Sequence, residues 1–93
     1  MIDGNPNEFL EAVYNGTDVY FIFDNKKYFG QGYNINNGKW HYEIYEINTQ
    51  QNAILWECTT ETVDECYNLF LLANIFNGKT FLEAESEIEW VDE

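Results

Sequence analysis

The chain has 93 residues, and its 17 acidic residues outnumber its 4 lysines so far that the formal net charge at pH 7 is -13. Nucleic-acid backbones and anionic membrane surfaces both attract cationic proteins, so this charge argues against direct nucleic-acid binding and against membrane attachment. Aromatic residues make up 18% of the chain. They provide large apolar areas, so we expect residues 1–93 to fold as a single domain rather than to remain disordered.

Residues 6–14 carry the signals of an N-terminal helix. Pro6 suits a first helical turn, because the N–H that proline lacks has no partner there in any case. Phe9 and Val13 are four residues apart and therefore share one face, and Gly16 follows as a stop signal.

Four segments rich in β-branched and aromatic residues follow, and polar turns separate them. These predicted strands comprise residues 17–23, 28–33, 39–48 and 53–58. In the third strand, Trp40, Tyr42 and Ile44 alternate with His41, Glu43 and Tyr45. The short connections predict a four-stranded antiparallel meander.

A second helix is predicted after Thr60, which we expect to be its N-cap. The apolar stripe of this helix is broad and follows helical spacing: Val63, Cys66, Tyr67, Phe70 and Leu71. Such a stripe is typical of a helix that lies across a sheet. Thr80 is then expected to cap one short turn over residues 81–83.

The final segment reads EAESEIEWVDE, and it alternates from Ala84 onward. Period two predicts a short C-terminal strand with Ile88 and Trp90 facing inward and the glutamates in water. A charged outer row resists edge-to-edge pairing with another molecule, and this is enough to explain it; an anionic binding surface is the functional alternative. Together, these elements predict an α+β fold: an N-terminal helix, a four-stranded antiparallel meander, a second helix packed on one sheet face, and a short C-terminal strand.

The residue inventory does not favour an enzyme. His41 is the only histidine, and its H-x-E pattern with Glu43 lacks the cysteine motif of zinc deaminases. Cys58 and Cys66 have neither a metal nor a redox spacing, so we expect both to pack as small apolar groups. Gly30 and Gly32 do not complete a dinucleotide motif. We therefore expect no catalytic residues, no cofactor and no metal site. We also expect a cytoplasmic location, because the N-terminus lacks the basic and apolar segments of a signal peptide.

Several short segments carry a resemblance to a known group of proteins. They are Lys27-Tyr28-Phe29, Trp56, Glu65-Cys66, Gly78-Lys79-Thr80-Phe81 and Ile88-Glu89-Trp90-Val91-Asp92. In this pattern the chain resembles small acidic uncharacterised proteins of Gram-positive bacteria and their mobile elements. It lacks the first glycine of the pattern. The resemblance implies a phage or plasmid setting and carries no assigned activity.

The favoured hypothesis is a non-enzymatic protein-binding module that engages a basic partner, such as a nucleic-acid-handling protein that it inhibits. Its candidate binding residues are acidic and tyrosine side chains expected at the surface: Glu61, Asp64, Glu65, Glu83, Glu85, Glu87, Glu89, Asp92, Tyr33 and Tyr45. The alternatives are a small-molecule or peptide sensor with an aromatic cleft, and a self-associating structural protein.

Overall fold

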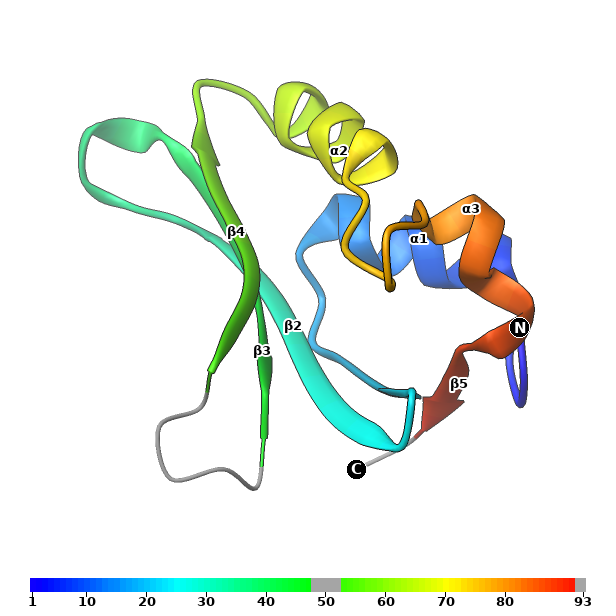
Figure 1. The fold of residues 1–93 in the computed structure, drawn as a ribbon. Helices are drawn as coiled ribbons and strands as arrows, with labels where there is room; N and C mark the ends of the chain where they lie inside the picture. Colours follow the sequence, from blue (N-terminus) through cyan, green and yellow to red (C-terminus); the bar gives the residue numbers. More distant parts are fainter. Residues whose placement is uncertain (48–52, 92–93) are drawn as a thin grey trace.

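The computed structural model describes residues 1–47 and 53–91 and confirms the α+β class (Figure 1). One antiparallel sheet has the strand order β4-β3-β2-β1-β5. The strands are β1 (Val19–Phe23), β2 (Lys26–Asn34), β3 (Trp40–Glu46), β4 (Ile54–Thr60) and β5 (Glu89–Val91). The α-helices are α1 (Pro6–Asn15), α2 (Val63–Leu72) and α3 (Phe81–Ala84), and two 3-10 turns are η1 (Asn36–Gly38) and η2 (Glu85–Glu87).

The four predicted meander strands pair in chain order. The hairpin between β1 and β2 turns at Asp24 and Asn25, which both have positive φ values (53° and 63°). Such left-handed pairs match the right-handed twist of the flanking strands. β5 pairs antiparallel with β1 and makes the sheet five-stranded.

The predicted N-terminal helix is confirmed as α1. The Asn5 side chain accepts hydrogen bonds from the first turn, and Gly16 ends the helix in the left-handed conformation (φ 74°). Phe9 and Val13 are its buried residues, so the predicted apolar face is the one that packs inward.

The predicted N-cap of the second helix was wrong by two residues. Thr62 caps α2, and its side chain accepts a hydrogen bond from the backbone N–H of Glu65. Thr60 is still part of β4, where it pairs with Trp40. Sheet pairing therefore extends the strand to the residue that local propensity assigned to the helix.

The predicted strand from Ala84 was also wrong over most of its length. Residues 81–87 form α3 and η2, and only Glu89–Val91 are extended as β5. Thr80 caps α3 as predicted, in a reciprocal capping box with Glu83. Phe81, Ala84 and Ile88 are fully buried. Their spacing of three, four and seven suits a helical turn, and the alternating pattern of the later residues concealed it.

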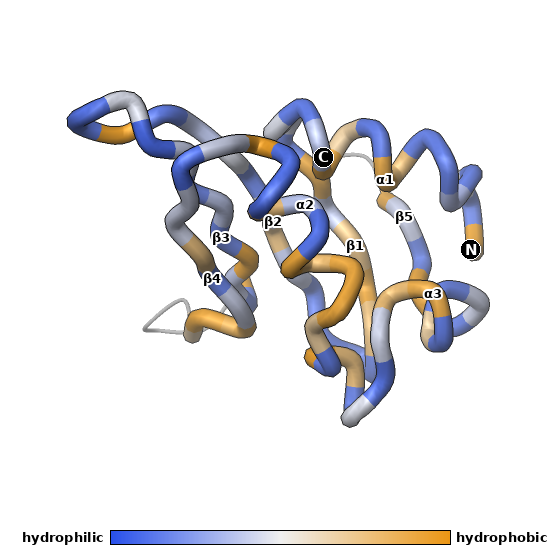
Figure 2. The backbone as a smooth tube through the Cα atoms, turned by 90° about the horizontal axis from the view of Figure 1, so that it is seen from above, coloured by the Kyte–Doolittle hydropathy of each residue, from blue (hydrophilic) through white to orange (hydrophobic). Residues whose placement is uncertain are grey.

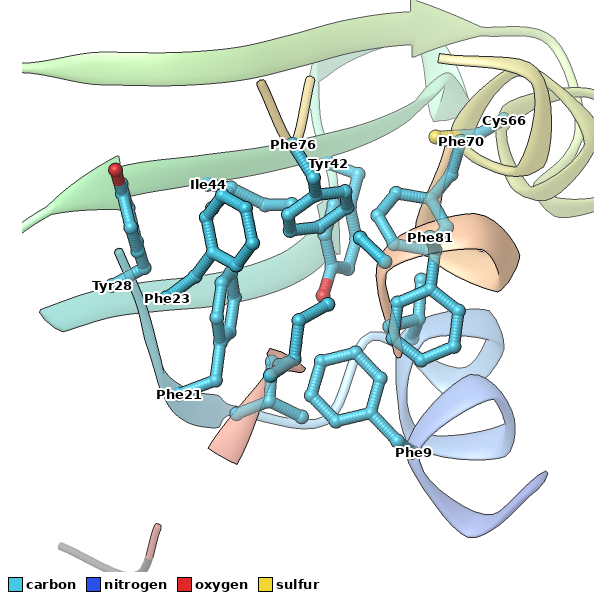
Figure 3. Packing of buried hydrophobic residues seen from close by; sticks show 14 residues of the cluster. Phe9, Phe21, Phe23, Tyr28, Tyr42, Ile44, Cys66, Phe70, Phe76 and Phe81 are labelled. Atoms are coloured by element: carbon cyan, nitrogen blue, oxygen red, sulfur yellow. The ribbon is translucent and has the colours of Figure 1, made fainter. Parts of the chain in front are cut away.

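The core lies between the helices and one face of the sheet, and it is largely aromatic (Figure 3). Phe9 stacks on Phe81 with ring centroids 5.2 Å apart and meets Phe21 edge-on at 5.8 Å. Figure 2 shows hydrophobic residues concentrated along β1 and in the C-terminal part of α2. Such ring pairs add to the stabilisation from apolar burial.

The helices of the described residues are each too short or too polar to reach across a lipid bilayer.

Candidate functional site

The three α-helices lie on one side of the sheet, and within the described residues no helix covers the other side (Figure 1). Cross-strand pairing shows which side chains share this uncovered side, because directly opposed residues point the same way. We call it the open face, and its central residues are Tyr20, Phe29, Gln31, Tyr33, His41, Glu43, Tyr45, Glu57 and Thr59.

An aromatic cluster occupies the part of the open face over β1, β2 and β3. Phe29 is only 7% exposed, yet it does not belong to the main core. Its ring lies 4.9 Å from that of Tyr20 and 5.4 Å from that of Tyr45. The Lys27 ammonium lies 5.9 Å from the centre of the Tyr20 ring. Tyr20 and Tyr45 therefore bury Phe29 and present their own partly exposed rings to solvent.

A polar network adjoins this cluster and centres on Glu43. The carboxylate accepts hydrogen bonds from the Gln31 amide (2.7 Å) and from the Tyr33 hydroxyl (3.3 Å). His41 Nε2 lies 3.1 Å from Glu43 Oε1, and His41 Nδ1 lies 2.9 Å from Thr59 Oγ1. Both ring nitrogens of the only histidine therefore have partners, which fixes the orientation of the imidazole.

Glu57 completes a group of potential metal ligands. It lies on β4 directly opposite Glu43 on β3. One ligand atom from each of His41, Glu43 and Glu57 lies within 4.8 Å of the other two. The sequence does place His41 and Glu43 on one face. It does not reveal Glu57 as the third member, because that depends on the register between two strands.

Tyr33 and Tyr45 of the open face are held in their neutral form. Partial burial and the nearby Glu43 carboxylate raise the pKa of both Tyr33 and Tyr45 above the usual value for a phenol. Both hydroxyls therefore remain hydrogen-bond donors well above neutral pH.

The predicted binding residues at the start of α2 do not lie on the open face. Glu65 is used in the capping box of α2. The Tyr14 hydroxyl donates to Asp64 Oδ1 at 2.6 Å, which links α1 to α2. Lys39 lies 3.6 Å from Glu61. These carboxylates therefore have local partners.

The predicted acidic binding residues near the C-terminus are also distributed among different local contacts. Glu83 belongs to the capping box of α3, and hydrogen bonds from Thr80 lower the pKa of its carboxyl group. Glu85 pairs with the N-terminal ammonium group, and Glu87 pairs with Lys79. Glu89 pairs with Ile22 of β1, so it lies on the open face with Tyr33 and Tyr45. Asp92 lies outside the described residues.

The two cysteines meet at the junction of β4 and α2. Their sulfur atoms are 2.7 Å apart. Burial is the main cause that raises the pKa of both the Cys58 and the Cys66 thiol. Both thiols are therefore protonated at neutral pH, and a protonated thiol is a poor nucleophile.

The alternative function, a sensor with an aromatic cleft, needs a pocket. None is found in the part of the chain that the structure describes. Comparisons with protein-family models, with curated proteins and with solved structures each found no match for this chain.

Proposed function

We propose that this chain is a non-enzymatic protein-binding module whose open face engages a basic segment of another protein. The observation that supports this most directly is the composition of the open face. Partly exposed tyrosine rings lie beside the Glu43 and Glu57 carboxylates on a sheet surface that no helix of residues 1–47 and 53–91 covers.

Each component of this surface has a role in such binding. Tyr20, Tyr33 and Tyr45 supply apolar contact area with few rotatable bonds, which limits the entropy lost on association. Glu43 and Glu57 supply negative charge close to those rings, and Glu89 adds a carboxylate on the same face at the edge strand β5. The net charge of -13 adds a long-range field that accelerates the approach of a cationic partner.

The proposed partner is a cytoplasmic nucleic-acid-handling protein, which this chain inhibits. Proteins of that class bind phosphate backbones through clusters of lysine and arginine. An acidic module bound to such a cluster would block access of the nucleic acid. A phage or plasmid setting, which the sequence resemblance suggests, fits an inhibitor of this kind.

The test begins with capture of partners by the immobilised protein at low salt. The affinity of one purified partner is then measured at increasing NaCl. We expect the affinity to fall steeply with salt, and Tyr45→Ala and Glu57→Gln each to weaken binding at least tenfold. Glu11→Gln is the matched control, because it removes the same charge from an exposed position of α1.

Two results would count against this function. One is an affinity that does not change with salt. The other is equal weakening by Glu57→Gln and Glu11→Gln, because binding would then depend on total charge and not on the open face.

A further inference from the structure

We infer that His41, Glu43 and Glu57 form a binding site for a divalent transition-metal ion, with zinc as the best-matched example. The three residues combine one imidazole with two carboxylates on adjacent strands of the open face.

The spacing of the ligand atoms fits coordination of one ion. Zinc bonds to nitrogen and oxygen are about 2.0–2.2 Å long, so two ligand atoms on a tetrahedral ion lie about 3.3 Å apart. His41 Nε2 and Glu43 Oε1 are 3.1 Å apart. The Glu57 ligand atom lies within 4.8 Å of both. Glu57 is exposed, so a change of side-chain rotamer can bring its carboxylate closer.

Neighbouring side chains hold two of the ligands in place. In the tautomer whose Nδ1–H donates to Thr59 Oγ1, His41 Nε2 carries a lone pair instead of a proton, and a metal ion bound there would replace the hydrogen bond between Nε2 and Glu43 Oε1. Gln31 and Tyr33 donate hydrogen bonds to the two Glu43 oxygens. Metal-binding histidines and carboxylates are commonly oriented by outer hydrogen bonds of this kind.

Electrostatics also favour a cation at this position. Glu43 and Glu57 face each other directly across β3 and β4. Like charges directly opposite each other in a sheet are destabilising. A bound divalent cation converts this repulsion into attraction.

The ligand types select the class of ion. Imidazole suits zinc, copper and nickel, whereas magnesium and calcium prefer sites made entirely of oxygen ligands. Three protein ligands leave the fourth position of a tetrahedral ion open to water or to a group from another molecule.

Calorimetric titration of the untagged full chain with zinc, after treatment with a chelator, tests the site. We expect one zinc ion to bind per chain. His41→Ala and Glu57→Gln should each weaken the zinc affinity at least tenfold. Glu11→Gln should leave it unchanged. Glu57 and Glu11 are both exposed, so neither glutamine variant disturbs the core.

Nuclear magnetic resonance gives a second, residue-specific readout, because His41 is the only histidine. Zinc should shift the imidazole Nε2 resonance, and an equal concentration of magnesium should not. The Cys58–Cys66 pair is the competing zinc site, since thiols are good zinc ligands. Zinc binding that survives His41→Ala but is lost in Cys58→Ala would overturn the inference. Failure of zinc to move the imidazole resonance would also overturn it.

Discussion

At the scale of single residues, Tyr42 has the clearest unsatisfied hydrogen-bonding group. Its hydroxyl is the one buried side-chain polar atom of the described residues that has no hydrogen-bond partner. An unpaired buried donor costs about 1–3 kcal/mol. A Cβ atom at Gly30 would lie 2.9 Å from this hydroxyl, so Gly30 leaves the space that the hydroxyl occupies. We expect Tyr42→Phe to raise the free energy of unfolding in urea by about 1 kcal/mol. Tyr45→Phe, on the open face, should change it by less than about 0.5 kcal/mol. A loss of stability in Tyr42→Phe would mean that the hydroxyl has a partner.

Burial of two weak acids predicts how stability responds to alkaline pH. Burial raises the pKa of Tyr42 and of Cys66 above the values of the unfolded chain. The folded state therefore holds these protons more tightly. The resulting stability is fully present below the unfolded pKa values, about 8.5 for cysteine and about 10 for tyrosine, and is lost as pH rises beyond them. We expect the circular dichroism signal to be lost in base, and Tyr42→Phe to move that transition to higher pH. A transition unaffected by Tyr42→Phe would rule out this tyrosine as its cause.

At the scale of elements, the start of α2 shows how tertiary pairing selects among similar residues. The sequence predicted Thr60 as the N-cap, but pairing with Trp40 keeps Thr60 in β4, and Thr62 caps the helix instead. Thr62→Ala should therefore lower the free energy of unfolding by about 1 kcal/mol, because the backbone N–H of Glu65 loses its acceptor. Thr17→Ala, at an exposed position before β1, is the control and should have little effect. Thermal denaturation of the two variants makes the comparison. Equal losses would mean that the Thr62 cap does not stabilise α2.

The C-terminal segment shows the limit of periodicity as a guide. Ile88 satisfies two patterns at once: it follows Ala84 at helical spacing, and it belongs to the alternating run that ends at Trp90. The capping box between Thr80 and Glu83 decides in favour of a helical turn for the first half. The strand forms only where β1 offers a partner. A sequence alone does not reveal that long-range partner, so the boundary between helix and strand was misplaced.

At the scale of the whole molecule, the fold class was predictable because its signals are local. Turn residues separate β1 to β4, and apolar spacing marks α1 and α2. From the sequence we expected no metal site, and only the His41–Glu43 pair of the site inferred above could be read from it. His41 and Glu43 share a strand, but Glu57 joins them through the β3–β4 register, which includes an irregularity at Ile44/Tyr45. The same dependence on register conceals the aromatic cluster around Phe29.

The excess of negative charge predicts how salt acts on the whole molecule. The ion pairs Lys39–Glu61 and Lys79–Glu87 are exposed, and such pairs contribute about 0–1 kcal/mol each. The net charge of -13 means that repulsion among carboxylates outweighs these attractions. Salt shortens the screening length from about 10 Å at 0.1 M to about 3 Å at 1 M, so it weakens repulsion more than attraction in this chain.

We expect 1 M NaCl at pH 7 to raise the melting temperature by about 5 °C, equivalent to about 1 kcal/mol. The control is the same titration near pH 4, close to the isoelectric point of about 4.1, where little net repulsion remains to be screened. A melting temperature that falls with salt at pH 7 would show that local ion pairs, and not net repulsion, dominate the electrostatics of the folded state.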